Sequence, residues 1–268
     1  MIYIICALYY EAKPIIKKFN LVRNNSYSTF QVFENSYIKL VISGTGIINS
    51  ACAVSYILSK EDSFSESSII NIGVCGSTKR KKGEAVLVNK IHDVSSKKDF
   101  YTDILLKHEF SEGFLETYPG PVFKKSIPDI CDMEGSGFFK ASSKFFYTYQ
   151  IHLIKIVSDN LDGNKINKDF VQDIIERNLE DIKGYIDRII RSFKNEDAVD
   201  LRHMSLIDDI GIKLRFTESE KTILRKLYKS YVIRNSSEPD IEKYGNVKVK
   251  TKNESKGCFN EFRKYLSE

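Results

Sequence analysis

The sequence has few of the patterns that mark metal, redox or disulfide-stabilised proteins. Its five cysteines are an odd number and include no CxxC pair, and four of them lie in apolar stretches, where cysteine acts as a small hydrophobic side chain. Its four histidines lack the spacing of metal ligands. We therefore predict no bound metal and no cofactor.

The N-terminus also lacks the features of a secretory leader or a membrane span. No basic stretch precedes a long apolar run, and the apolar residues 2–8 are too few for either kind of segment. We expect a cytoplasmic protein with no membrane partner.

Neither sign of charge dominates the composition. A formal net charge of +5 on 268 residues permits an anionic ligand but does not indicate nucleic-acid binding, so we expect no nucleic-acid partner. With 42% hydrophobic and 29% charged residues, the composition is typical of a globular protein. The length fits one domain, or one domain with an appendage.

Apolar runs typical of strands alternate with segments that have helical periodicity. We predict strands at residues 2–8, 30–34, 37–43, 69–72, 85–94, 127–130 and 151–157, with the second and third forming a hairpin. We predict helices at about residues 47–58, 168–193 and 218–232. This alternation predicts the α/β class, with a sheet that is mostly parallel in its first and last parts.

Two regions depart from this pattern. Residues 95–125 have weak periodicity and a Pro-Gly-Pro breaker, so we expect a loop with short irregular structure there. After about residue 200 the chain becomes polar and Lys-rich around a charged helix. We therefore divide it into an α/β domain at 1–200 and a mostly helical appendage at 201–268, whose role the sequence does not indicate.

Three of the predicted apolar strands are each followed by an acid. Residues 2–8 lead into Glu11, residues 127–130 lead into Glu134, and residues 151–157 lead into Asp159. The binding crevice of an α/β sheet lies at the carboxyl ends of its strands. We therefore expect these three carboxylates to converge on one site.

Five short motifs give the sequence a family resemblance. They are Ala7–Glu11, Ser43-Gly44-Thr45-Gly46, Asn71–Gly76, Asp132-Met133-Glu134-Gly135 and Val157-Ser158-Asp159. In this order and at these spacings, over about residues 1–195, the chain resembles the nucleoside phosphorylase/nucleosidase superfamily. Within that superfamily it is most similar to bacterial 5′-methylthioadenosine/S-adenosylhomocysteine nucleosidases. The resemblance implies a mixed central sheet, wrapped into a distorted barrel and surrounded by helices, in a homodimer.

The resemblance also implies roles for individual residues. Glu11 matches the acid that activates water, Glu134 the acid that holds the ribose hydroxyls, and Asp159 the acid that protonates the purine at N7. Further substrate-binding positions are expected at Thr45, Gly76, Asp132, Met133 and Ser158. The implied activity is hydrolysis of the N-glycosidic bond of adenine-type nucleosides, such as 5′-methylthioadenosine or S-adenosylhomocysteine.

Elementary chemistry supports a set of separate acids. Breaking a ribosyl–purine bond develops positive charge on the sugar and negative charge on the base. An acid at the base, which must carry a proton near neutral pH, neutralises the leaving group, and general-acid catalysis contributes about 10²–10⁴-fold. A carboxylate beside the sugar hydroxyls stabilises the cation-like sugar.

Two alternatives remain open at this stage. The first is a purine nucleoside phosphorylase, although Asn71 and Val74 stand where phosphorylases carry the Arg and Ser that hold phosphate, and neither pairs with a phosphate dianion as Arg does. The second is a catalytically weakened nucleoside-binding module. Asp132 also replaces the usual first Glu of the Glu-Met-Glu motif, and Val74 replaces a small polar residue of the nucleosidases.

Several residues have simpler structural interpretations. Asp159 is a good helix cap, Glu134 fits a helix N-terminus, and an exposed Glu11 in a first helical turn is commonplace. The glycine motif at 43–46 is a tight turn rather than a dinucleotide loop, and the basic turn at 79–82 is expected to be solvated. Five aromatic residues are candidates for the ring that stacks on the purine, and the sequence does not choose among them: Phe100, Tyr101, Phe110, Phe114 and Tyr118.

Overall fold

The computed structural model describes residues 1–61, 64, 66–123, 127–163, 167–196, 201–235, 237–245, 247, 249 and 251–267. The chain forms two compact units, 1–187 and 188–268. The boundary predicted at 200/201 involves residues outside this described set. No helix in the described ranges is long and apolar enough to cross a membrane.

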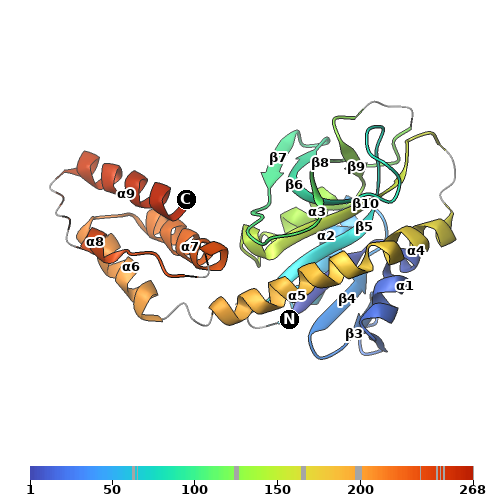
Figure 1. Cartoon of the computed structure of the whole chain (residues 1–268), viewed down its shortest axis with the longest axis horizontal. Helices are drawn as coiled ribbons and strands as arrows, with labels where there is room; N and C mark the ends of the chain where they lie inside the picture. Colours follow the sequence, from blue (N-terminus) through green and yellow to red (C-terminus); the bar gives the residue numbers. More distant parts are fainter. Residues whose placement is uncertain are drawn as a thin grey trace. The chain divides into compact units, whose positions relative to one another are not determined.

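The first unit contains one mixed sheet, which has ten strands within the described residues (Figure 1). The strands are β1 (Ile2–Cys6), β2 (Val22–Asn24), β3 (Gln31–Glu34), β4 (Ile38–Ile42), β5 (Ser68–Gly76), β6 (Ala85–Asp93), β7 (Lys98–Tyr101), β8 (Ser111–Thr117), β9 (Ile130–Asp132) and β10 (Ile151–Asp159). The helices that surround the sheet are α1 (Tyr9–Lys18), α2 (Ile47–Leu58), α3 (Gly135–Ser142), α4 (Lys168–Arg177) and the start of α5 (Leu179–Glu196), with a short 3₁₀ turn, η1 (Thr148–Gln150), before β10.

Five of the strands close into a barrel. The path β10-β6-β8-β9-β5 is completed because β5 also pairs with β10. Strands β1, β4, β3 and β2 continue the sheet from β5, and β7 pairs with β6. Strands β1, β5 and β10 run parallel, while the hairpins add antiparallel pairs. The predicted mixed α/β sheet with a distorted barrel is confirmed.

The central strands are apolar because both of their faces are covered. Every residue of β1 is buried, and so are nearly all residues of β5 and β10. Continuous apolar runs are typical of strands buried on both faces. Helices α2 and α3 pack against each other, as do α1 and α4, and all four also contact the sheet.

Strand register brings three strand ends together at Gly76. This last residue of β5 pairs with Asp159 of β10 on one side and with Cys131 of β9 on the other. Strand β9 also pairs with β8, which places Thr117 opposite Asp132. The ends of β5, β9 and β10 therefore form one continuous floor.

The prediction of irregular structure over residues 95–125 is wrong at β7 and β8, which both pair with β6. It is confirmed at 102–110 and 118–123, and residues 124–125 lie outside the described set. The buried positions of β8 are Gly113, Leu115 and Thr117, so two of its three inward residues are not apolar and the alternation is hard to see. Strand β7 is mostly exposed and is fixed by its backbone pairing with β6.

The predicted helix at 168–193 is two helices. Asn178 separates α4 from α5, and its side-chain amide donates to the carbonyl oxygens of Gly83 and Ile174. This amide competes with regular helical hydrogen bonding at the junction. The buried positions on both helices match the predicted apolar periodicity, including Ile174, Ile182 and Ile186.

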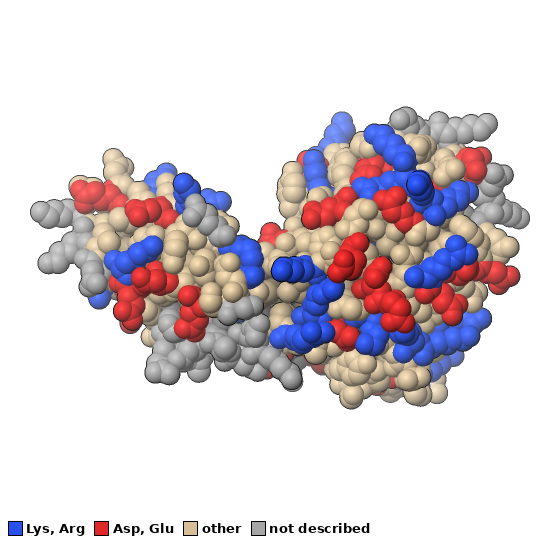
Figure 2. Space-filling model, in the orientation of Figure 1, with Lys and Arg blue, Asp and Glu red and all other residues tan. Residues whose placement is uncertain are grey.

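The polar face of these helices carries paired charges. Arg177 pairs with Asp173 on α4, and Lys183 pairs with Asp187 on α5, each at i,i+4 spacing. On the face drawn in Figure 2, Lys and Arg side chains are interspersed with Asp and Glu over the first unit. Such exposed pairs contribute little to stability, so burial of the apolar face holds these helices in place.

The second unit is helical, as predicted for the appendage. It contains α6 (Leu201–Lys213), α7 (Glu218–Asn235), α8 (Glu242–Gly245) and α9 (Lys252–Ser267). These helices enclose a core of their own, in which Leu224, Tyr228 and Phe262 are buried and the ring of Tyr244 stacks on that of Phe262 at 4.1 Å. The polar, Lys-rich composition of this part is therefore compatible with a packed helical unit.

A buried histidine in β10 makes the first unit sensitive to acid. His152 is 3% exposed, and its Nδ1 lies 3.1 Å from the hydroxyl oxygen of the buried Tyr185. Burial lowers the pKa of His152 to about 3. The unfolded chain binds a proton below about pH 6.5 while the folded chain does not, so folded stability falls as pH drops from about 6.5 toward 3.

We predict that His152→Asn removes part of this acid sensitivity. Asn keeps an acceptor near the Tyr185 hydroxyl but does not titrate. The free energy of unfolding of the wild type should fall with decreasing pH more steeply than that of the variant, by up to about 1.4 kcal/mol per pH unit. Urea unfolding followed by circular dichroism between pH 4 and 8 measures this, and parallel curves would contradict it.

Candidate active site

The sheet floor opens into one pocket that all the predicted site residues line. Its cavity volume is about 210 Å³. The eight predicted residues found there are Glu11, Glu134, Asp159, Thr45, Gly76, Asp132, Met133 and Ser158. Positions up to 148 residues apart in the sequence thus meet at one place, as the strand-end argument predicts.

Glu11 is buried and held by backbone donors on both sides. It lies in the first turn of α1, where its Oε2 accepts the N–H of Leu8 at 2.8 Å. Its Oε1 accepts the N–H of Val74, on β5, at 3.0 Å. Burial raises the pKa of Glu11, while these hydrogen bonds and the charge of Lys155 oppose the rise. A carboxylate with a raised pKa is suited to accept a proton.

Glu134 follows β9 and stands at the start of α3, but it does not cap that helix with its side chain. Its Oε1 instead accepts the N–H of Gly46 at 2.8 Å. Gly46 has φ +101°, a conformation that favours glycine, and this turn aims its N–H at the carboxylate. The glycine motif at 43–46 is therefore a tight turn that orients Glu134. Burial, followed by repulsion from Asp132, raises the pKa of Glu134 to about 7.

Asp132 and Lys155 form a buried ion pair beneath these acids. The Lys155 Nζ lies 2.8 Å from Asp132 Oδ2, and each side chain is 1% exposed. Asp132 also accepts hydrogen bonds from the Thr117 hydroxyl and the Gly135 N–H, both at 2.8 Å. Its lone pairs are thus well satisfied, which a buried ion pair requires.

Lys155 is a site residue that the sequence analysis missed. Burial alone would lower the pKa of its ammonium, but the carboxylates of Asp132, Glu134 and Glu11 raise it, and the net direction is upward. The ammonium therefore keeps its charge and offsets part of the negative charge of the three acids. A signal was present, because one Lys in the apolar run 151–157 requires a buried acidic partner.

Asp159 ends β10 and does not cap the next helix. Its Oδ1 accepts the Leu161 N–H at 2.9 Å, and its Oδ2 accepts the Ser158 hydroxyl at 2.8 Å. The capping residue of α4 is Asn167, whose side chain accepts the N–H of Asp169. The capping interpretation of Asp159 is therefore wrong, and the carboxylate lies in the pocket wall.

The five aromatic candidates for the base position lie elsewhere. Phe100 packs on Phe139, Phe110 packs on Tyr185, and Phe114 lies near His92. Tyr101 is 58% exposed on β7, and Tyr118 is buried with its hydroxyl on Glu116. None of the five lines the pocket.

Among the described residues, the aromatic side chains that do line the pocket are Tyr10 and Phe123. Phe123 is 60% exposed and follows Gly120 and Pro121, which also line the pocket. The Pro-Gly-Pro breaker was therefore the useful signal in this region, because it marks the loop that forms one pocket wall. The five aromatic candidates predicted from the sequence all precede this breaker.

Asn71 and Val74, which stand where phosphorylases hold phosphate, lie in different surroundings. Val74 lines the pocket, but its N–H is already donated to Glu11. Asn71 is buried, and its side-chain amide donates to the Ile5 carbonyl at 3.0 Å. No Lys or Arg is found among the described residues that line the pocket. These residues therefore supply no cation for a phosphate dianion.

Comparison with solved structures identifies the fold. A crystal structure of an MTA/SAH nucleosidase superposes with a TM-score of 0.56 at 18% identity, covering 70% of this chain and 95% of that chain. The 5′-methylthioadenosine nucleosidase of Arabidopsis thaliana gives 0.56 at 15%, covering 72% and 95%. The futalosine hydrolase of Helicobacter pylori gives 0.56 at 17%, covering 69% and 97%.

The chain therefore shares the fold of these nucleosidases and of this hydrolase, in agreement with the resemblance of its sequence motifs. No family model matches the sequence, and no curated protein matches it.

We predict that Lys155→Met destabilises the first unit more at pH 8 than at pH 6. The change leaves three buried carboxylates without their counter-charge, and breaking a buried ion pair costs about 3–5 kcal/mol. At lower pH the carboxylates take up protons, so the loss shrinks. Urea unfolding at both pH values measures it, with Lys155→Arg as the charge-retaining control. A loss below about 1 kcal/mol at both pH values would show that the pair is dispensable.

Proposed function

We propose that this protein hydrolyses the N-glycosidic bond of adenine-type purine nucleosides, such as 5′-methylthioadenosine or S-adenosylhomocysteine. The observation that carries the proposal is the convergence of Glu11, Glu134 and Asp159 on one pocket. The neighbours with this fold include nucleosidases whose names specify those substrates. A homodimer in the cytoplasm, without cofactor, is part of the same proposal.

In the proposed reaction the three acids act on different parts of the nucleoside. Asp159 donates its proton to purine N7 as the C1′–N9 bond breaks and its electron pair moves to the base. Glu134 accepts hydrogen bonds from the ribose hydroxyls and stabilises the cation-like sugar. Water adds to C1′ and gives its proton to Glu11. The products are the free base and the free sugar.

Water is favoured over phosphate as the nucleophile by the charges around the pocket. Four carboxylates line it, those of Glu11, Asp132, Glu134 and Asp159, and they repel a dianion. The ammonium of Lys155 is engaged with Asp132. The phosphorylase alternative would need a cationic partner that the described lining residues do not provide.

We predict release of adenine from 5′-methylthioadenosine or S-adenosylhomocysteine in phosphate-free buffer. Asp159→Asn keeps the size of the side chain but removes the proton donor, so kcat should fall by about 10²–10⁴-fold. Asp169→Asn, at an exposed position of α4, is the matched control and should retain wild-type kcat. Chromatography of the free base measures release.

Two outcomes would contradict the proposal. Release that depends on added phosphate would favour the phosphorylase, and nucleoside binding without any release would favour the binding module. Testing inosine and futalosine beside the adenine nucleosides separates the base specificity from the reaction type.

The pH dependence of kcat/KM provides a separate prediction. Glu134 must be ionised to stabilise the sugar cation, and its pKa is about 7, so the acid limb of the kcat/KM profile should have an inflection near that value. Asp132→Asn removes the repulsion that helps to raise this pKa and frees the Lys155 charge. The inflection should then move to lower pH, and an unmoved inflection would assign it to another group.

A further inference from the structure

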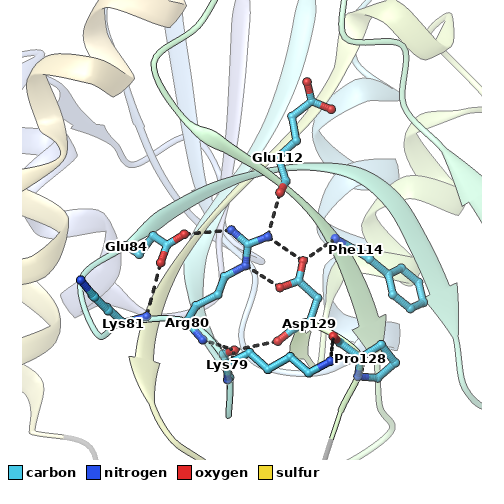
Figure 3. A network of polar contacts seen from close by, with 9 residues as sticks. Lys79, Arg80, Lys81, Glu84, Glu112, Phe114, Pro128 and Asp129 are labelled. Atoms are coloured by element: carbon cyan, nitrogen blue, oxygen red, sulfur yellow. Dashed lines mark hydrogen bonds and ion pairs between the residues drawn. The ribbon is translucent and has the colours of Figure 1, made fainter.

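Arg80 makes a fork-shaped contact with Asp129 in the network drawn in Figure 3. Its Nε and Nη2 each donate to one carboxylate oxygen, with Nη2 at 2.7 Å from Oδ2. The side chains are 16% and 18% exposed. Such bidentate pairs are among the strongest and most directional polar contacts. The prediction of a solvated turn at 79–82 is therefore wrong at Arg80.

The residues around this pair tie two further segments to the same point. Asp129 Oδ2 also accepts the Phe114 N–H of β8 at 2.9 Å, and the Asp129 carbonyl accepts the Ser77 hydroxyl at 2.7 Å. Lys79 Nζ donates to the Pro128 carbonyl at 2.5 Å. We call Ser77, Lys79, Arg80 and Asp129 the Arg80 clamp. It joins the β5–β6 turn, β8 and the entry to β9.

The position of β9 depends on such an anchor because the strand has little pairing of its own. It contains three residues, forms one register pair with β5 and three with β8. Asp129 immediately precedes it, and Asp132 and Glu134 follow three and five residues later. The position at which the chain enters β9 therefore determines the positions of the Asp132 and Glu134 carboxylates.

A glycine in β8 leaves room for the clamp. A Cβ atom at Gly113 would lie 2.8 Å from Asp129 Oδ2 and 3.0 Å from Arg80 Nη2. Arg80 Nη2 also donates to the carbonyl of the preceding residue, Glu112, at 2.7 Å. The guanidinium thus packs directly against the β8 backbone, and a larger residue at 113 would push the pair apart.

We propose that Arg80 is a positioning residue, which holds β9 in the register that places Asp132 and Glu134 in the pocket. The inference rests on the proposed nucleosidase function for its kinetic readout. Arg80 itself does not line the pocket. Its effect on the reaction passes through Asp129 and the three residues of β9.

The test compares variants that break the contact of Arg80 with Asp129 and a variant that breaks its contact with Glu84. Arg80→Met and Asp129→Asn each remove the fork, and kcat should fall by about 10- to 100-fold, as expected for a small misplacement of catalytic groups. The double variant should lose no more than the worse single variant, because both break one contact. Arg80→Lys keeps the positive charge but cannot form the bidentate contact, so it should regain less than half of the kcat that Arg80→Met loses.

Glu84→Gln is the matched control. Glu84 Oε1 accepts from Arg80 Nη1 at 2.9 Å and its Oε2 accepts the Lys81 N–H, so these contacts lie within the β5–β6 turn and away from residues 128–132. This variant should keep kcat within twofold of the wild type. All variants are assayed below their thermal midpoints, so that loss of folded protein is not read as loss of turnover.

Amide hydrogen exchange gives a readout that does not need turnover. In Arg80→Met the amides of Phe114 and of residues 130–132 should exchange at least tenfold faster, and in Glu84→Gln they should not change. If the wild type releases no base, the proposed function fails and exchange alone decides the positioning role. The inference is overturned if Arg80→Met keeps kcat within twofold, if Glu84→Gln loses as much, or if exchange in β9 is unchanged.

Discussion

The charge balance beneath the pocket depends on the buried ion pair of Lys155 and Asp132. Three carboxylates gathered away from water would repel each other and would be costly to desolvate. The ammonium of Lys155 offsets this cost and is itself kept charged by the acids around it. The pair is satisfied by further hydrogen bonds at Asp132. The strand that carries Lys155 is thus both a part of the barrel and the electrostatic support of the site.

Backbone amides orient the acids above this pair. Each acid accepts at least one main-chain N–H, and the donors include Leu8, Val74, Gly46, Gly135 and Leu161. Main-chain donors are fixed by the strands and turns that contain them, so the carboxylates are held by the fold itself. Such preorganisation avoids rearrangement when charge develops during a reaction. The strands and turns of the first unit therefore act directly on the site, since their amides hold its carboxylates in place.

Much of this arrangement could be predicted from the sequence, because strands and the residues that follow them leave patterns within a short stretch of chain. Apolar runs gave the central strands, and acids after those runs predicted Glu11, Glu134 and Asp159 at one edge of the sheet. Strand β8 was missed because Gly113 and Thr117 hide its alternation. The aromatic residues predicted to stack on the base do not line the pocket. Two of them pack against residues distant in sequence, Phe139 and Tyr185, and a short stretch of sequence does not indicate such contacts.

The pocket is built from two kinds of structure that can diverge separately. Its floor consists of strand ends whose acids are fixed by paired backbone, whereas one wall comes from loop residues 120–123, beyond β8. Substitution or length change in such a wall alters which ligand fits without disturbing the acids below it. A fold of this kind can therefore acquire new ligands in evolution while its set of acids stays in place.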